Sequence, residues 1–161
     1  MKIALVAIAA LTAAATPALA QNAGQIARVR GGASCAGCNL FQAELGGLEA
    51  RGLDLSRARL RQADLSLAVM NRTRFNGADL RDVEAYGGVF SGSNFSGADL
   101  TNASFVGTYL EGASFSGAIL SGTNLSGAQL DRATGLTQSQ LNRACGDEAT
   151  VLPRGLRIPA C

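Results

Sequence analysis

The chain of 161 residues contains no histidine and no tryptophan, and Lys2 is its only lysine. Without histidine it lacks the side chain that most often acts as a general base, so we expect no enzyme, cofactor or metal site. Long basic runs are also missing, which argues against nucleic acid as a partner. After the N-terminus, no apolar run approaches the roughly 18 residues that a membrane-spanning helix requires.

Aromatic residues are scarce at 5%, although apolar residues make up 47% of the chain. This apolar content excludes a disordered protein. A core built from leucine, alanine and a few phenylalanines predicts many small, similar layers rather than one irregular centre. Residues 38–132 hold eight arginines against ten acidic residues, so this body is close to neutral.

The N-terminus has the pattern of a secretory signal peptide over residues 1–20. Lys2 precedes an apolar stretch at 3–15, and residues 18–20 form an A-x-A cleavage site before Gln21. We therefore expect a periplasmic or secreted protein, the alternative being an uncleaved membrane anchor. The residue directly after the cleavage site is Gln21 and not a cysteine, so a lipid anchor is not indicated.

The repeated unit of the sequence is five residues long. Every fifth position from 40 to 130 is apolar, through nineteen repeats without an insertion. The position two residues earlier is mostly small, as at Ala58 and Ala78, and the position two residues later is often glycine, as at Gly77 and Gly97. Glycine there permits a positive φ. Neither the helical nor the strand period explains this step, which instead requires a turn every five residues.

These repeats resemble the pentapeptide-repeat family, whose unit is written loosely as A(D/N)LxG. Residues 63–65, 78–80, 98–100 and 123–127 match it closely, and the resemblance covers residues 38–132. It implies an all-β solenoid, a right-handed quadrilateral β-helix in which four pentapeptides form one coil of twenty residues. About five coils, stacked about 4.8 Å apart, would make a rod roughly 23 Å long.

A coil of twenty residues predicts that residues twenty apart stack on one face. One expected ladder is all leucine and another nearly all phenylalanine, namely Leu40, Leu60, Leu80, Leu100 and Leu120, and Leu55, Phe75, Phe95 and Phe115. Ala50 and Ala85 are small where a large residue is expected. In those repeats Leu48 and Val83 fill the other inward position, as close packing requires.

Solenoids need covered ends, and the sequence divides accordingly. We expect an N-terminal leader and cap over residues 21–37 and a C-terminal cap over 133–161. Residues 137–140 form a capping box, with Leu136 and Leu141 as a hydrophobic staple, so a short helix near 138–145 should end at Cys145-Gly146. The tail 147–161 then runs irregularly over the last coil.

The four cysteines lie in two pairs at opposite ends of the predicted rod. That separation exceeds the ~7 Å limit between the Cα atoms of a disulfide. We therefore predict a bridge between Cys145 and Cys161, and one between Cys35 and Cys38. The C-x-x-C spacing of the second pair also suits a redox or zinc site, but no thioredoxin-like unit is present, and the rod keeps the four thiols apart.

Charged side chains form two groups on the predicted surface. Glu44, Asp64 and Glu84 are twenty apart and form an acidic column, which could bind a cation or simply be a solvated face. Arginines gather in the N-terminal half, where an anion site or a mixed-charge face are the alternatives. They are Arg51, Arg57, Arg59, Arg61, Arg72, Arg74 and Arg81. Arg61 stacks on Arg81, and we expect Asp79 to neutralise Arg59.

One group of outward positions is apolar. Val69, Val89 and Tyr109 are twenty apart, and Tyr86 and Val106 lie three residues before two of them, across one corner. Such a patch often marks a partner surface, although scattered surface apolar residues are also normal.

The sequence favours a non-enzymatic structural or interaction module, with an unknown protein partner and self-association left open. One alternative is a DNA-mimic topoisomerase-binding protein, an activity of some family relatives that requires an acidic surface and cytoplasmic residence. The other is a thiol redox protein using Cys35 and Cys38.

Overall fold

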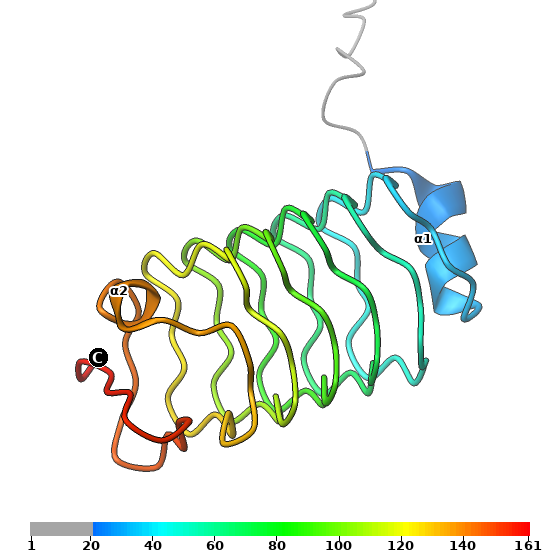
Figure 1. Ribbon diagram of the computed structural model, residues 1–161. Coiled ribbons are helices and arrows are strands. Elements are labelled where there is room, and N and C mark those ends of the chain that lie inside the picture. The colour runs from blue at the N-terminus through cyan, green and yellow to red at the C-terminus, as the bar shows by residue number, and fades with distance from the viewer. Residues whose placement is uncertain (1–20) are drawn as a thin grey trace, which may run out of the picture.

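The computed structural model describes residues 21–161, and the predicted signal peptide lies outside this part of the chain. The described chain winds into a rod with a helix at each end (Figure 1). Helix α1 (Ala23–Arg30) covers one end, and the short helix α2 (Gln138–Leu141) lies at the other, near the C-terminus. Within residues 21–161, neither helix is long and apolar enough to cross a bilayer.

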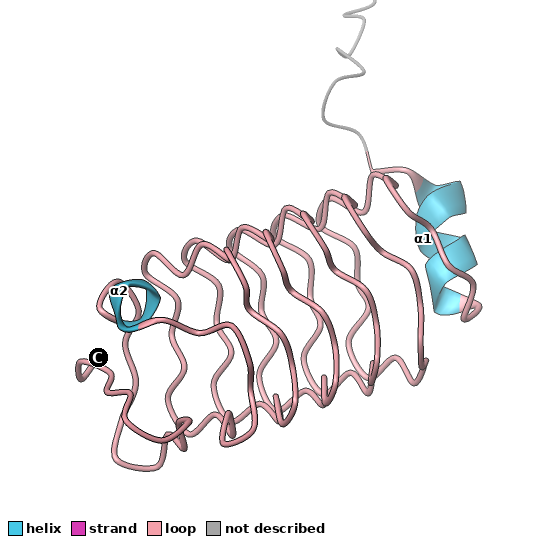
Figure 2. Cartoon of the chain, viewed as in Figure 1, coloured by secondary structure: helices cyan, strands magenta, loops and turns pink. Residues whose placement is uncertain are grey.

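Between the helices, the backbone returns to the same position every twenty residues. Residues twenty apart form parallel β-bridges, beginning with Asn39 and Arg59. The N–H of Leu40 donates to the carbonyl of Arg59 at 2.8 Å, and the N–H of Arg59 donates to the carbonyl of Cys38 at 2.8 Å. Each side of the coil is too short to form a strand, so Figure 2 shows turns and loops throughout the rod. The predicted twenty-residue step is therefore observed.

The bridged residues form four columns, which define four faces of the rod. Face A contains Asn39, Arg59, Asp79, Asp99 and Ile119, and face B contains Glu44, Asp64, Glu84, Ser104 and Asn124. Face C contains Glu49, Val69, Val89, Tyr109 and Gln129, and face D contains Asp54, Arg74, Asn94, Ser114 and Thr134. Faces meet at two-residue corners, and we name each row of corners by its faces, such as the B/C edge.

The corners explain two preferences of the repeat. The N–H of Ala43 donates to the carbonyl of Leu40 at 3.1 Å, which closes a turn whose third residue has a positive φ. At the majority of corners the residue with a positive φ is glycine. The Asp or Asn before the large residue accepts a bond from an N–H two residues on, as Asp64 does from Ser66 at 2.8 Å.

The interior consists of stacked ladders, as the sequence predicts. Phe75, Phe95 and Phe115 stack in parallel, with ring centroids 5.0 and 5.2 Å apart. Val83 and Ala85 are both fully buried, so the larger Val83 compensates for the small Ala85 in the core of that repeat, as predicted. The corresponding pair Leu48 and Ala50 is only partly buried.

Helix α1 closes the N-terminal end, where the sequence predicts a cap but not its helical form. Ile26 and Val29 are buried against the first coil. Polar side chains satisfy the open backbone of that coil: Gln25 accepts from the N–H of Asn39 at 2.7 Å, and Arg30 donates to the carbonyl of Glu44 at 2.8 Å. The helix therefore covers both the apolar centre and the unpaired backbone groups of the coil.

The C-terminal cap continues the winding of the rod, but with more than twenty residues between the positions that bridge it to the last coil. Thr137 and Gln140 form the predicted capping box, and Leu141 is buried. The helix ends at Leu141 rather than at Cys145, because the chain then pairs with the last coil: Cys145 bridges Asn124. The tail is also more regular than predicted, since Val151 bridges Gln129 and Ala160 bridges Gly146.

Candidate interaction surface

The five residues of the predicted apolar patch lie together on face C and the B/C edge. Val69, Val89 and Tyr109 follow one another on face C through parallel bridges. Tyr86 and Val106 occupy the first corner position of the B/C edge. Tyr86 is 58% exposed and Tyr109 is 54% exposed, whereas the three valines are partly buried. The register of the coils thus places all five side chains on one side of the rod.

Leu67 belongs to the same patch and was missed by the sequence analysis. It is 61% exposed and has a φ of 57°, a conformation that disfavours a leucine. The equivalent positions on the B/C edge are Gly47, Gly87, Gly107 and Gly127. A leucine at a position otherwise held by glycine was the signal in the sequence. We call Leu67 and the five predicted residues the apolar patch.

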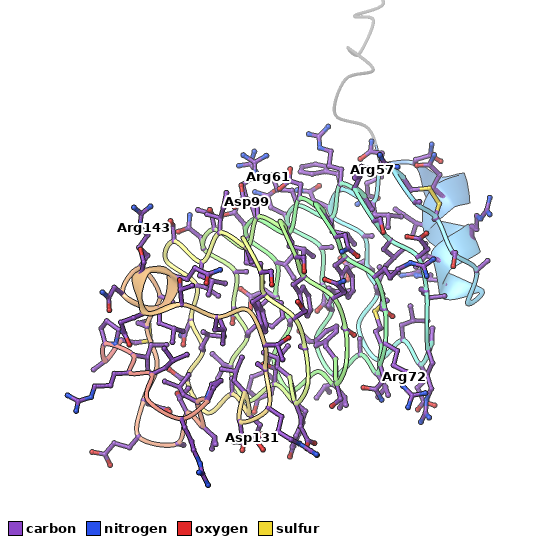
Figure 3. The ribbon with its side chains drawn as sticks, in the orientation of Figure 1. Arg57, Arg61, Arg72, Asp99, Asp131 and Arg143 are labelled. Carbon is purple, nitrogen blue, oxygen red and sulfur yellow. A yellow bond between two sulfur atoms is a disulfide. The ribbon has the colours of Figure 1, made fainter. Side chains whose placement is uncertain are left out.

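The adjoining C/D edge carries charge that changes sign along the rod. Arg51 and Arg72 line a hollow with Asn71 and Ser91, and neither arginine makes an ion pair within residues 21–161. Further along the edge lie Glu111, Asp131 and Arg132, and Arg132 pairs with Glu111. Figure 3 shows Arg72 and Asp131 along the same lower edge, with Arg72 toward α1.

Three other arginines of the N-terminal half, Arg61, Arg74 and Arg81, form ion pairs. Arg61 pairs with Asp82 at 3.2 Å, and Arg74 pairs with Asp54 at 2.9 Å. The hydrogen bond from Arg74 holds the pKa of Asp54 well below its ordinary value. These pairs make face D and the A/B edge a mixed-charge surface.

The predicted neutralisation of Arg59 by Asp79 is wrong. Both residues sit in one column, but Arg81 reaches back two residues and binds the Asp79 carboxylate through two hydrogen bonds of 2.7 Å. These bonds lower the pKa of Asp79. Arg59 instead lies over the ring of Phe41, 5.3 Å from its centroid.

The acidic column stacks on face B as predicted. Glu44, Asp64 and Glu84 are linked by parallel bridges, and Asp64 uses one oxygen to hold the corner N–H of Ser66. Within residues 21–161, the structure contains no group of three His, Cys, Asp or Glu side chains suited to a metal ion.

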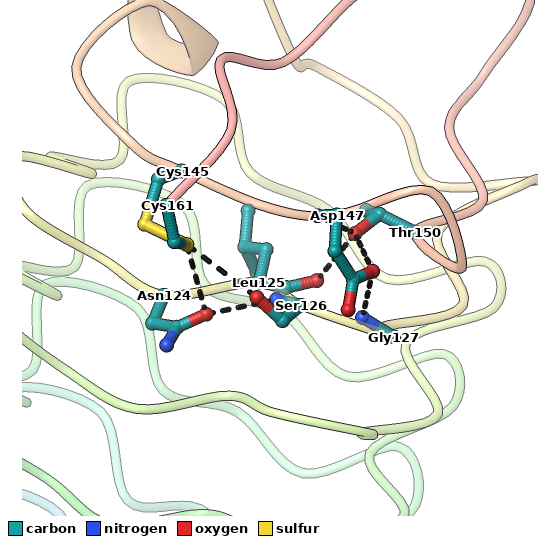
Figure 4. Close-up of a disulfide and its surroundings, with 8 residues drawn as sticks. All are labelled: Asn124, Leu125, Ser126, Gly127, Cys145, Asp147, Thr150 and Cys161. Atoms are coloured by element: carbon teal, nitrogen blue, oxygen red, sulfur yellow. Dashed lines mark hydrogen bonds between the residues drawn. A yellow bond between two sulfur atoms is a disulfide. The ribbon is translucent and has the colours of Figure 1, made fainter.

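Both cysteine pairs lie where a bond between their sulfur atoms is sterically allowed. The Cα atoms of Cys145 and Cys161 are 4.8 Å apart, and those of Cys35 and Cys38 are 5.5 Å apart; the sulfurs of each pair are joined in the structure. Figure 4 shows the C-terminal pair beside Asn124.

A cleft of the C-terminal cap lies beside the same disulfide, lined by residues such as Ser126 and Glu148. Asp147, also at this cleft, accepts from the backbone N–H of Gly127 at 2.8 Å, and this bond is the main cause that lowers the Asp147 pKa. The ionised carboxylate therefore fastens the cap to the last complete coil.

Several solved structures share similarity with this chain. The pentapeptide repeat protein Rfr23 from the cyanobacterium Cyanothece 51142 is 23% identical, with 80% of this chain and 97% of that chain covered and a TM-score of 0.41. HetL from Nostoc sp. strain PCC 7120, involved in heterocyst differentiation regulation, is 24% identical over 76% and 65% of the two chains, with a TM-score of 0.43.

QnrB1, a plasmid-mediated fluoroquinolone resistance protein, is 20% identical over 69% of this chain and 68% of its own, with a TM-score of 0.44. No curated protein matches the sequence significantly. The model of the family described as pentapeptide repeats matches in eight copies, over residues 51–84, 75–117, 98–134 and 109–145. These matches span more than half of the chain, and they coincide with the bridged coils. The chain is a member of the pentapeptide repeat family, whose fold is the right-handed quadrilateral β-helix.

Proposed function

We propose that this protein is an exported, non-enzymatic interaction module that docks a protein partner on its apolar patch. The observation that carries the proposal is the grouping of Leu67, Tyr86 and Tyr109, each more than half exposed, on one side of the rod. Contiguous exposed apolar surface of this kind marks a protein interaction site more often than a solvated face. Nearly five rigid coils over residues 38–132 would hold the patch flat.

Export through residues 1–20 forms part of this proposal, because it would place the chain in an oxidising compartment. There, both cysteine pairs would be oxidised. The Cys145–Cys161 bridge would then keep the C-terminal tail on the last coil, and the thiols that a redox role needs would be absent.

The charge pattern supports a protein interaction module over a DNA mimic. A mimic of the DNA backbone needs a continuous acidic surface, whereas the acidic column on face B ends after three residues. The neighbouring A/B edge carries the mixed pair of Arg61 and Asp82.

Affinity capture tests the proposed function. The purified chain beginning at Gln21 is immobilised and exposed to the periplasmic and secreted fractions of the native cell, beside the double variant Val89→Asp/Tyr109→Asp. We expect the double variant to lose the partner, since a carboxylate at each site disrupts apolar contact. The matched control is Ile119→Asp, because Ile119 is 48% exposed but lies on face A. Equal capture by wild type and the double variant would refute the proposed docking site.

A further inference from the structure

We infer that the apolar patch also binds a second copy of this chain, in an antiparallel dimer whose twofold axis passes through Val89. This inference rests on the proposed function, because it assigns an occupant to the same surface. It follows from the order of side chains along face C and its two edges. All coils share one spacing, so two such faces remain in register along their full length when they meet.

Face C is self-complementary when one copy is reversed end to end. Val89 occupies the middle of the column, so it meets Val89 of the second copy on the axis. Val69, one coil before the middle, then faces Tyr109 of the second copy, one coil after it. A smaller side chain therefore meets a larger one on both sides of the axis, which allows close packing.

On the B/C edge, Tyr86 of the middle coil meets Tyr86 of the second copy, and the corners on either side of it place a leucine opposite a glycine. Leu67 belongs to the coil before the middle, with its Cδ2 over Gly87 of the same chain, and the equivalent corner in the coil after the middle is Gly107. An ideal Cβ built at Gly107 would meet no atom within 4 Å, so the space beside this glycine is open. The exposed Leu67 of each copy would fill the space left by Gly107 of the other.

The C/D edge supplies charge complementarity in the same register. Arg72 lies one coil before the middle and faces Glu111 of the second copy, which lies one coil after it. Arg51, two coils before the middle, faces the corner formed by Asp131 and Arg132. Among residues 21–161, Arg51 and Arg72 have no ion pair, and Glu111 pairs only with Arg132, an exposed contact of little energetic value.

The parallel arrangement of two copies is disfavoured. An axis along the rod brings every face C residue against its own counterpart, so that Glu49 meets Glu49 and Tyr109 meets Tyr109. Like charges would then be opposed at Glu49, and Arg72 would not reach Glu111. Only the reversed arrangement places Arg72 opposite Glu111.

The size of the contact predicts a weak dimer. Five bridged residues at about 4.8 Å per coil make a face about 24 Å long. Together with its edges, this face would bury on the order of 1,000 Å² over both copies, which is the lower limit for a specific interface. We therefore expect a dissociation constant on the order of 10 μM.

Sedimentation velocity of the chain beginning at Gln21, with its disulfides formed, tests the dimer. Measurements from about 1 μM to about 300 μM bracket the expected constant. Val89→Asp should weaken the dimer at least ~30-fold, because it places two carboxylates together on the axis. Ile119→Asp, on face A, should leave the dissociation constant within about twofold of wild type.

Charge reversal tests the antiparallel register. Arg72→Glu and Glu111→Arg should each weaken self-association about tenfold, since each opposes like charges twice in the dimer. An equimolar mixture of these two variants should form a heterodimer of nearly wild-type affinity, because both cross-contacts then join opposite charges. A parallel dimer predicts no such recovery.

Three results would overturn the inference: a wild-type chain that stays monomeric over the whole range, a dimer insensitive to Val89→Asp, or a mixture as weak as its components. A monomeric wild type with patch-dependent capture of another protein would leave the proposed function intact. An intact dimer without patch-dependent capture would refute the proposed function and leave the dimer in place. The two claims can therefore fail separately.

Discussion

Thr73 and Thr123 are both fully buried at the small inward position of the repeat, but only one of their hydroxyl groups is satisfied. The hydroxyl of Thr123 donates to the carbonyl of Leu100 at 2.8 Å. The hydroxyl of Thr73 has no hydrogen-bond partner among the described residues, because Ser93 already bonds both the N–H of Thr73 and the carbonyl of Met70. Valine has nearly the shape of threonine, so substitution isolates the hydroxyl at each site.

The two substitutions should change stability in opposite directions. A buried hydroxyl without a partner costs about 1–3 kcal/mol, so Thr73→Val should raise the free energy of unfolding by about 1–2 kcal/mol. Thr123→Val removes a bond worth about 1 kcal/mol and should lower it by about that amount. The Leu100 carbonyl keeps the N–H of Ala103 as a donor, which limits the loss.

Thermal melting and urea unfolding, followed by far-ultraviolet circular dichroism, measure this difference. The two variants should melt several degrees apart, since 1 kcal/mol shifts the midpoint by about 3 °C in a domain of this size. Equal urea m-values would show that the same cooperative unit unfolds in each variant. If Thr73→Val destabilises the rod as much as Thr123→Val, the argument from hydrogen-bond satisfaction is refuted.

Three further predictions concern packing and the C-terminal cap. Gly88→Ala should destabilise the rod by about 1–3 kcal/mol, because its Cβ would lie 2.5 Å from the buried ring of Phe90; adding Phe90→Leu should recover part of the loss in the same melts. Asp147→Asn should lower the melting temperature at neutral pH. Because the pKa of Asp147 is lowered in the fold, its carboxylate stabilises the fold above the ordinary pKa of 3.8, and this stabilisation is lost as the pH falls through the lowered pKa. The difference in melting temperature from wild type should therefore vanish in acid. Cys161→Ser frees the tail from Cys145 and should cost about 3 kcal/mol by the loop-entropy model, with hydrogen exchange increased in the cap; unchanged exchange would contradict this role.

Much of the fold could be predicted because its determinants repeat. A period of five fixes the inward positions, and a coil of twenty sorts Phe75, Phe95 and Phe115 into one stack. The capping box at Thr137 is equally local, since its two hydrogen bonds lie within four residues. Each of these features depends on spacing that the sequence displays directly.

The features that were missed depend on what each segment meets in space. Helix α1 has only Ile26 and Val29 as buried residues, so its apolar pattern is faint until the open coil beneath it is considered. Arg59 shares a column with Asp79, but a column does not show which of two arginines reaches a carboxylate; Arg81 is closer. Val151 lies on face C although it is more than twenty residues after Gln129, so the twenty-residue spacing of the coils does not predict this pairing.

The side chains of α1 have a consequence for growth of the rod. A bare coil is a template, because its unpaired N–H and carbonyl groups can recruit the backbone of another molecule. Gln25 and Arg30 occupy such groups, and the C-terminal tail occupies those at the other end. Filaments that continue the backbone pairing from one molecule to the next are thereby blocked at their first step.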